Sequence, residues 1–133
     1  MVPLLKGKDE VTRQRTVAQG LYADLHGVPE KDLRDERKIE ELLREACDAS
    51  DLTAVGQPVV HRFAGGGEGL TGFLLLSESH ISVHTYPEIG LLMVDILSCG
   101  KTHPREGLSV FERELAHDRI EIRELRRGGD RIG

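Results

Sequence analysis

The sequence predicts an α+β fold, a two-layer sandwich in which two helices cover one face of a mostly antiparallel sheet. Segments that are rich in β-branched residues, or that alternate apolar with polar side chains, recur about six times along the chain, as expected for strands. Two further segments repeat their apolar residues at three- and four-residue spacing, as expected for amphipathic helices. Short turns join most of these segments, which favours antiparallel neighbours and a helical layer on one side of the sheet.

The overall composition indicates a single soluble globular domain. The chain has 133 residues, of which 38% are hydrophobic and 31% charged, and this length suits one core but not two domains. It contains no apolar run of transmembrane length, and its first residues lack the apolar core of a signal peptide. A net charge of −5 without a basic, aromatic-rich patch argues against a nucleic-acid partner. Two cysteines, Cys47 and Cys99, are too few for a disulfide framework and indicate a reducing cytoplasm.

The first third of the chain is expected to contain an arm, a strand and a helix. Residues 1–18 are polar and unpatterned, which predicts a flexible N-terminal arm before a domain at 19–127. A short strand is expected at Leu21–Leu25, followed by a turn at His26-Gly27. From Glu30 to Ala49 the apolar spacing predicts one amphipathic helix with a single buried stripe. The stripe consists of Leu33, Ile39, Leu42, Leu43, Ala46 and Cys47.

The remainder of the chain should supply five more strands and the second helix. The strands are expected at 53–63, 70–76, 79–86, 91–97 and 119–125. In the first of these, Gly56 and Pro58 indicate a bulge or an edge position. Gly65–Gly69 is a flexible loop that lacks the features of a phosphate-binding loop. The second helix is expected at Pro104–Ala116, and residues 128–133 form a solvated tail.

One stretch, Ser77–Glu88, gathers polar residues on a segment that is built like a strand. It reads S-E-S-H-I-S-V-H-T-Y-P-E, in which β-branched residues alternate with polar ones until Pro87 ends the ladder. The apolar run Phe73–Leu76 precedes it, so a buried strand delivers the chain to Glu78 and Ser79. In an arbitrary strand, a solvated polar face would explain the same pattern.

This stretch, together with Cys99-Gly100 in D-I-L-S-C-G, resembles the short prokaryotic class of S-adenosylmethionine decarboxylases. These are self-processing enzymes that carry a covalent pyruvoyl group in place of pyridoxal phosphate. The resemblance runs from about Leu21 to Gly128 and includes H-R-F at 61–63 and R-I-E-I-R-E-L-R-R-G at 119–128. It implies the same two-layer sandwich, no metal, and association of two such protomers in a dimer.

The resemblance implies that the chain is a precursor that cleaves itself between Glu78 and Ser79. The Ser79 side chain would attack the Glu78 carbonyl, and elimination from the resulting ester would release residues 1–78. The dehydroalanine left at 79 would hydrolyse to the pyruvoyl group. Thr71 stands where the family usually has a serine that assists this shift. His84 matches the base that takes the α-proton, a task that the near-neutral titration of histidine suits.

For turnover, the resemblance implies that the pyruvoyl group forms a Schiff base with the amine of a small-molecule substrate and accepts the electrons of the departing carboxylate. Cys99 matches the residue that then protonates Cα. A free thiol has a reference pKa of about 8.5 and is mostly protonated at neutral pH, as a proton donor must be. Without the resemblance, a lone cysteine after a buried strand would be interpreted as core packing.

The substrate-binding residues follow the family less closely. Phe63 and Tyr86 match the aromatic residues that stack the adenine, and Glu88 matches the carboxylate that accepts the ribose hydroxyls. His26 stands where relatives commonly carry an aromatic residue, Gly20 replaces a frequent histidine, and the loop at 64–68 is about two residues longer than usual. These differences surround the substrate and leave the reactive centre unchanged.

Three functions are therefore compared. The first is decarboxylation of S-adenosylmethionine, which supplies the aminopropyl donor for spermidine. The second is the same pyruvoyl chemistry on arginine or ornithine, with Glu68 or Asp24 near the distal cation. The third is a non-enzymatic metal-binding module. Its candidate ligands are His61, His80, His84 and Cys99, but on a strand His80 and His84 stand roughly 13 Å apart, too far for one ion.

The spacing of Ser79 and His84 predicts how the active site is assembled. Five residues apart on one strand, their Cα atoms should lie roughly 16 Å apart, with side chains on opposite faces. General-base catalysis needs contact within about 3 Å. We therefore expect a homodimer in which the two chains share each site. Residue 79 and Cys99 come from one chain, and the other chain supplies Phe63, Thr71, His84 and Glu88.

Overall fold

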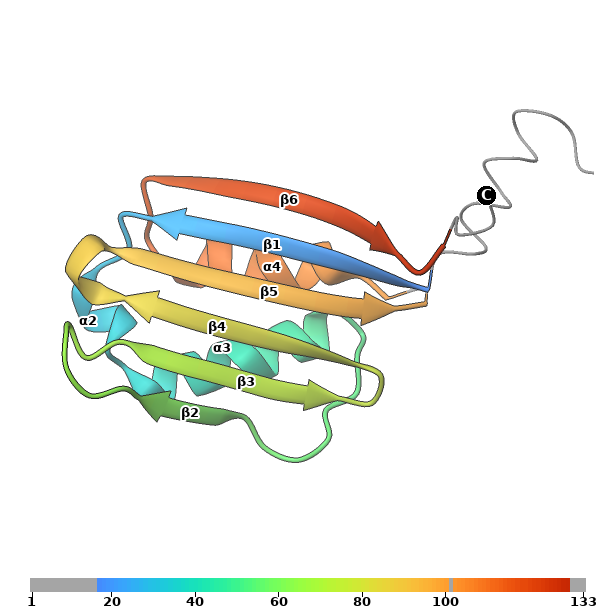
Figure 1. Ribbon diagram of the computed structural model, residues 1–133, viewed down its shortest axis with the longest axis horizontal. Helices are drawn as coiled ribbons and strands as arrows, with labels where there is room; N and C mark the ends of the chain where they lie inside the picture. The colour runs from blue at the N-terminus through green and yellow to red at the C-terminus, as the bar shows by residue number, and fades with distance from the viewer. Residues whose placement is uncertain (1–16, 101, 130–133) are drawn as a thin grey trace, which may run out of the picture.

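The computed structural model describes residues 17–100 and 102–129. Within these residues, a six-stranded antiparallel sheet is covered on one face by two helices (Figure 1), which confirms the predicted fold class. Val17 and Ala18 are the only residues of the expected 1–18 arm that the structure describes, and residues 130–133 of the expected tail also lie outside the described part. None of the described helices is long and apolar enough to cross a membrane.

The first strand of the chain lies inside the sheet. The order is β2-β3-β4-β5-β1-β6, so β1 pairs with β5 on one side and β6 on the other. The strands are β1 (Ala18–His26), β2 (Val59–Arg62), β3 (Leu70–Leu76), β4 (Ser79–Tyr86), β5 (Leu91–Cys99) and β6 (Arg119–Arg127). The bounds of β3 and β4 are as predicted. Strands β1, β5 and β6 are longer than predicted, because pairing extends each of them beyond its apolar centre.

The helix predicted at 30–49 is in fact two helices. A single turn, α2 (Glu30–Leu33), ends before α3 (Glu36–Ala49) begins. The break occurs because the Asp35 side chain caps α3, accepting a hydrogen bond from the Lys38 backbone N–H at 3.1 Å. The predicted apolar stripe is nevertheless buried at all six positions. The second long helix, α4 (Pro104–Glu114), ends two residues before its predicted end, because Leu115 is extended.

The strand predicted at 53–63 is also wrong over its first half. Only the four residues of β2 form a strand, and Ala54 contributes an isolated bridge to Leu76. Gly56 has φ of +80°, and Pro58 has no N–H to donate to a ladder. Residues 55–58, between the Ala54 bridge and the start of β2, are therefore not part of a strand.

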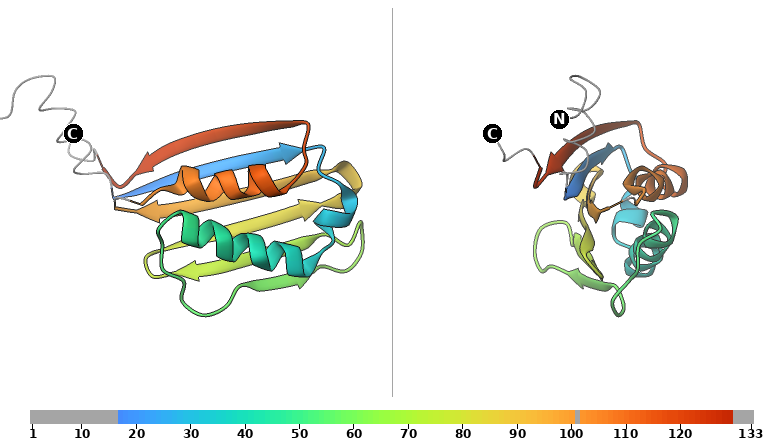
Figure 2. Two further views of the ribbon diagram at one scale, coloured as in Figure 1. Left: turned by 180° about the vertical axis from the view of Figure 1, so that it is seen from behind. Right: turned by 90° about the vertical axis from the view of Figure 1, so that its right-hand side faces the viewer.

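The core lies between the sheet and helices α3 and α4, as the view along the strands shows (Figure 2). Its largest fully buried side chains include Phe111 of α4 and Leu43 of α3. No described helix covers the other side of the sheet, which we call the open face. Four apolar side chains on the open face are well exposed: Val59 at 64%, Phe73 at 40%, Leu75 at 50% and Leu125 at 55%.

Candidate active site

The predicted reactive residues lie together at one end of β4 and β5. Ser79 begins β4 and pairs with Leu76, so that Ser77 and Glu78 form the tight turn of a hairpin. Cys99 is the last residue of β5, and its Sγ donates a hydrogen bond to the Glu78 carbonyl oxygen at 3.1 Å. This carbonyl belongs to the peptide bond that self-cleavage would break. A donor at its oxygen withdraws electrons from the carbon and would stabilise the negative charge that an attack creates.

The Ser79 hydroxyl is buried without a hydrogen-bond partner. The residue is 8% exposed and points toward the helical layer, and its Oγ makes no hydrogen bond. An unsatisfied buried hydroxyl costs about 1–3 kcal/mol of stability. Most native proteins avoid that cost, so the unpartnered hydroxyl calls for an explanation, and a catalytic role is one.

Thr71 and His84 form a second pair farther along the sheet. They lie opposite each other in the β3–β4 register, and Thr71 Oγ1 is 3.4 Å from His84 Nδ1. Both side chains are half-buried on the open face. The register therefore brings together two residues to which the sequence analysis assigned roles in the same reaction, and those roles stay predictions.

The four predicted substrate-binding residues surround the other end of the sheet from Ser79. Tyr86 ends β4, and Glu88 lies in the short 3₁₀ helix η1 (Pro87–Ile89) that follows it. His26 ends β1 and lies at the same level of the sheet as Tyr86, because both residues pair with Leu91 of β5. Phe63 follows β2 and packs on Gly69, where an added Cβ would lie 2.6 Å from the ring.

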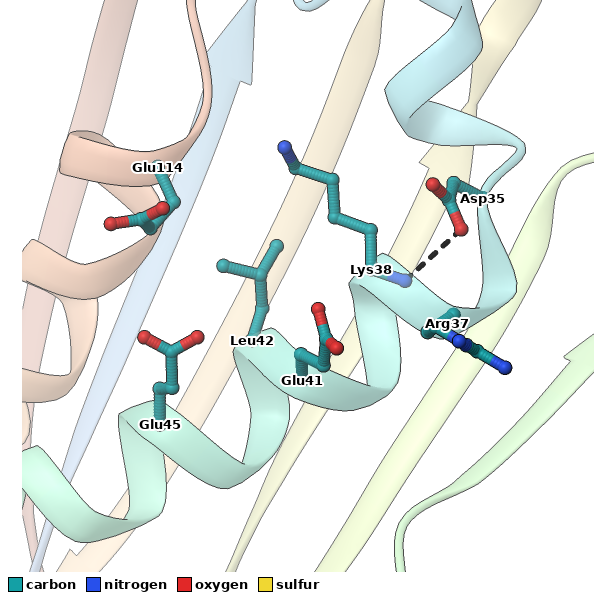
Figure 3. Close-up of a pocket in the computed structure, with 7 residues that line it drawn as sticks. All are labelled: Asp35, Arg37, Lys38, Glu41, Leu42, Glu45 and Glu114. Atoms are coloured by element: carbon teal, nitrogen blue, oxygen red, sulfur yellow. Dashed lines mark hydrogen bonds between the residues drawn. The ribbon is translucent and has the colours of Figure 1, made fainter.

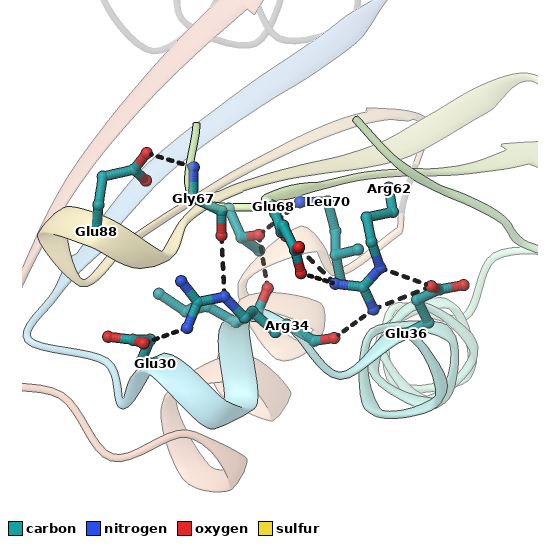
Figure 4. A network of polar contacts seen from close by, with 10 residues as sticks. Glu30, Arg34, Glu36, Arg62, Gly67, Glu68, Leu70 and Glu88 are labelled. Atoms are coloured by element: carbon teal, nitrogen blue, oxygen red, sulfur yellow. Dashed lines mark hydrogen bonds and ion pairs between the residues drawn. The ribbon is translucent and has the colours of Figure 1, made fainter. Parts of the chain in front are cut away.

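The glycine loop, residues 65–69, is anchored beside Glu88 (Figure 4). The Gly67 N–H donates to Glu88 Oε2 at 3.1 Å, and Arg34 Nε donates to the Gly67 carbonyl at 2.9 Å. Arg62 donates to the Arg34 carbonyl at 2.8 Å and to the Glu68 carbonyl at 3.3 Å. Arg34 is available for this because it lies in the break between α2 and α3. The carboxylate predicted to bind ribose therefore already accepts a hydrogen bond from this loop.

Sequence reasoning missed Asp95, a half-buried carboxylate in the middle of the open face. It lies on β5 opposite Ser82, diagonal to both His80 and His84. Burial raises the pKa of its carboxyl, the two histidines oppose this shift, and Asp24 reinforces it. The signal was present in the sequence, because Asp95 is the only charged residue in the mostly apolar strand Leu91–Cys99.

The contacts of His80 and His26 are not those expected of the metal-binding module considered above. His80 stacks on Phe73, with ring centroids 5.5 Å apart. His26 Nε2 lies 3.1 Å from Glu121 Oε1, and the hydrogen bond from His26 lowers the pKa of Glu121, as does Arg119. Among the described residues, the one group of three possible metal ligands with donor atoms within 4.8 Å is Asp24, His26 and Glu121. None of the four ligands considered from the sequence belongs to it.

A surface pocket of about 250 Å³ lies on the helical layer, away from all of these residues (Figure 3). It is lined by Asp35, Arg37, Lys38, Glu41, Leu42, Glu45 and Glu114. Its walls come from α3 and α4, and no predicted site residue reaches it. The geometry thus places the candidate site on the sheet and its ends.

Within one protomer the candidate site is divided into two groups. Ser79 and His84 are the first and sixth residues of an unbroken strand, which separates their Cα atoms by roughly 16 Å. The burial pattern of β4 also puts Ser79 on the helical side and His84 on the open face, as predicted. One chain alone does not bring the predicted nucleophile, Ser79, and the predicted base, His84, together.

Known proteins of one family resemble this chain along most of its length. The family profile described as S-adenosylmethionine decarboxylase matches residues 19–128. The S-adenosylmethionine decarboxylase proenzyme of Pyrobaculum aerophilum is 36% identical over 109 residues, covering 80% of this chain and 84% of the relative. That of Symbiobacterium thermophilum is 36% identical over 118 residues, covering 88% and 87%. The crystal structure of the adenosylmethionine decarboxylase from Aquifex aeolicus VF5 matches with a TM-score of 0.78 at 31% identity, covering 90% of this chain and 97% of that one.

The raised pKa of Asp95 predicts a pH-dependent effect on stability. A carboxyl with a raised folded-state pKa stabilises the protein below its unfolded pKa of about 3.9, and this stability is lost as pH rises through the folded value. Asp95→Asn should therefore raise the thermal unfolding midpoint at pH 7, with a gain that shrinks as pH falls toward 4.

This comparison is best made in chains that also carry Ser79→Ala, so that every molecule is intact. Asp48→Asn, an exposed position on α3, serves as the control and should leave the midpoint close to that of the parent at each pH. A midpoint at pH 7 that falls in Asp95→Asn would show that the carboxylate is stabilising and contradict the prediction.

Proposed function

The chain belongs to the S-adenosylmethionine decarboxylase family, and from this premise we propose that it cleaves itself between Glu78 and Ser79 and then decarboxylates S-adenosylmethionine. The relatives that it matches are named proenzymes, which supports a precursor that must be processed. The observation that carries the proposal is the arrangement of Cys99 and Ser79 at the Glu78–Ser79 peptide bond. The Cys99 thiol lies 3.1 Å from the Glu78 carbonyl oxygen, and beside it the Ser79 hydroxyl is buried and unpartnered.

Self-cleavage begins with an N→O acyl shift that the residues at the turn can carry out. Ser79 Oγ bonds to the Glu78 carbonyl carbon while the Cys99 thiol stabilises the oxygen that becomes negative. The Ser79 hydroxyl proton passes to the nitrogen of residue 79, the C–N bond breaks, and an ester remains. Removal of the α-proton of residue 79 then expels the Glu78 carboxylate and leaves dehydroalanine. Hydrolysis of dehydroalanine releases ammonia and gives the pyruvoyl group.

His84 is the proposed base for the α-proton. With Nδ1–H donating to Thr71 Oγ1, the other ring nitrogen stays unprotonated and can accept a proton. The Ser79 side chain points toward the helices, so the tetrahedral geometry of Cα turns the α-hydrogen away from that layer. A base that approaches from the open face suits this direction. Because His84 of the same chain is too far along β4, we propose that the base is the same histidine of the partner chain.

The pyruvoyl group supplies the electron sink that decarboxylation of an α-amino acid requires. Residue 79 would carry it, and the unpartnered hydroxyl beside a polarised carbonyl fits its formation from Ser79. Cys99 would supply the proton at the substrate Cα. Its half-buried thiol contacts the carbonyl oxygen of Glu78, the residue next to the one that would carry the pyruvoyl group. In our proposal Phe63, Tyr86 and His26 flank the adenine, and Glu88 accepts the ribose hydroxyls. The decarboxylated product serves as an aminopropyl donor for spermidine.

Two copies of the chain are proposed to form the active unit. The open face carries exposed apolar side chains and also the base, His84, so pairing of two open faces would bury the former and complete the site. Each site would combine residue 79 and Cys99 of one protomer with the partner's binding residues. Both cysteines are free in the structure, and we propose that the enzyme works in the cytoplasm.

The first test follows cleavage and activity together. Newly translated wild-type chain should convert into fragments 1–78 and 79–133, measured by intact mass, and only the second should react with phenylhydrazine. Ser79→Ala should stay a single inactive chain. The purified wild type should release labelled CO₂ from S-adenosylmethionine, with arginine and ornithine as the comparison substrates.

Each result has a distinct meaning in this test. A fully intact wild type that is still active would contradict the pyruvoyl proposal. Consumption of arginine or ornithine in place of S-adenosylmethionine would leave processing intact and contradict the substrate assignment. In that case the differences at Gly20, His26 and the 64–68 loop become the positions to exchange.

The second test separates the proposed roles of Cys99. Cys99→Ala removes the donor to the Glu78 carbonyl, so processing should slow but still proceed. The processed enzyme should lose turnover by about a hundredfold or more, as for other proton donors, and should inactivate faster as residue 79 is converted to alanine by misplaced protonation. Cys47→Ala, which alters the buried cysteine of α3, is the control and should retain processing and turnover. Normal turnover by Cys99→Ala would reduce Cys99 to a packing residue.

The third test asks whether the site is shared between chains. Ser79→Ala and His84→Ala chains, each with its own tag, are co-expressed and the mixed dimers isolated. One of the two sites then has an intact Ser79 and an intact His84, so the His84→Ala chain should be cleaved. Cleavage should be absent in the His84→Ala homodimer. If the His84→Ala chain stays uncleaved in verified mixed dimers, the site lies within one chain.

A further inference from the structure

Ser98, the residue before Cys99, has a side chain that the reaction described so far does not use. It is 1% exposed, and its Oγ has no hydrogen-bond partner. Among the described residues three buried side-chain atoms are unsatisfied in this way, the hydroxyl oxygens of Ser50, Ser79 and Ser98. Two of these three belong to adjacent strands at the cleavage site.

The sheet register sets Ser98 opposite Ser79. His80 pairs with Leu97 across β4 and β5, and continuing this antiparallel register by one residue brings Ser79 and Ser98 face to face. Both are buried, on the side of the sheet that the helices cover. Side chains paired in this way have Cβ atoms about 4.5–5.5 Å apart, which two hydroxyl groups can span by rotation about χ1.

Two consecutive residues of β5 therefore flank the scissile bond from different sides. The Cys99 thiol contacts the Glu78 carbonyl oxygen, and the continued register sets Ser98 opposite Ser79 on the side of the sheet that the helices cover. An alanine would fill the position of Ser98 without leaving a polar atom unsatisfied. The unpartnered hydroxyl is thus a cost to stability that packing does not explain.

We propose that Ser98 is a positioning residue for self-cleavage. This inference rests on the proposed function. After rotation about χ1, the Ser98 hydroxyl would accept a hydrogen bond from the Ser79 O–H and turn a lone pair of Ser79 Oγ toward the Glu78 carbonyl carbon. The Oγ–C bond then forms, the C–N bond breaks, and the Ser79 proton ends on the nitrogen of residue 79. Ser98 keeps its own proton throughout and is chemically the same after the step as before it.

The experiment compares Ser98→Ala and Ser98→Thr with wild type in cell-free translation, with cleavage followed by intact mass. Loss of one hydrogen bond should slow cleavage about tenfold in Ser98→Ala, whereas Ser98→Thr keeps the hydroxyl and should restore most of the rate. Ser50→Ala removes a buried unpartnered hydroxyl at the end of α3 and should cleave at the wild-type rate.

Two further measurements distinguish positioning from structural damage. In the Ser79→Ala background, where no chain is cleaved, Ser98→Ala should leave the thermal unfolding midpoint unchanged or raise it. Hydroxylamine cleaves esters, so it reports how much ester has accumulated. It should release no additional fragment from Ser98→Ala, because the missing hydroxyl slows formation of the ester and not its breakdown.

The outcomes separate this proposal from the function on which it rests. If wild type cleaves and Ser98→Ala cleaves equally fast, Ser98 has no part in the step and the proposed function stands. If Ser98→Ala lowers the unfolding midpoint, or accumulates ester, or is matched in slowness by Ser50→Ala, the positioning role is also wrong. If wild type itself never cleaves, both the proposed function and this inference fail.

Discussion

An unbroken β-strand cannot bring its own first and sixth residues together, and this constraint on β4 shapes the whole candidate site. Ser79 and His84 are separated by roughly 16 Å and by the thickness of the sheet. The core requires this arrangement, because Ile81 and Val83, which are fully buried, must face the helices on the same side as Ser79. His84, the proposed base, therefore lies on the open face, and this placement is the reason for proposing a dimer.

The open face is unusual in what it carries. It combines exposed apolar side chains with a half-buried carboxylate, Asp95, and two histidines diagonal to it. On a fully solvated sheet face, burial would not raise the pKa of a carboxyl as it does for Asp95. Covering the face with a second copy would desolvate Asp95 further and bring its charge closer to the two rings. Assembly and the electrostatics around the base His84 are in this way linked.

The substrate end depends on a different device, a break in a helix. The Asp35 side chain caps the start of α3, and Arg34, in the break between α2 and α3, donates to the Gly67 carbonyl, while Arg62 donates to the Arg34 carbonyl. These bonds fix the glycine loop against Glu88. In the proposed function, a longer loop at this point would change the surroundings of the substrate without altering the strands that carry the predicted reactive residues. This separates chemistry from recognition within a small domain.

The sequence by itself determined whatever depends on neighbours along the chain. Three features could be predicted because each repeats with a local period or lies within one segment. They are the alternation along β3 and β4, the buried stripe of α3 and the motif around Ser79. Only the tertiary structure decided the break at Arg34–Asp35, the insertion of β1 between β5 and β6, and the meeting of Cys99 with the Glu78 carbonyl. It also decided that Asp95 lies diagonal to His84, and the same register continued by one residue sets Ser98 opposite Ser79. These depend on strand register, which joins residues distant in sequence and is set by the packing of the whole sheet on its helices.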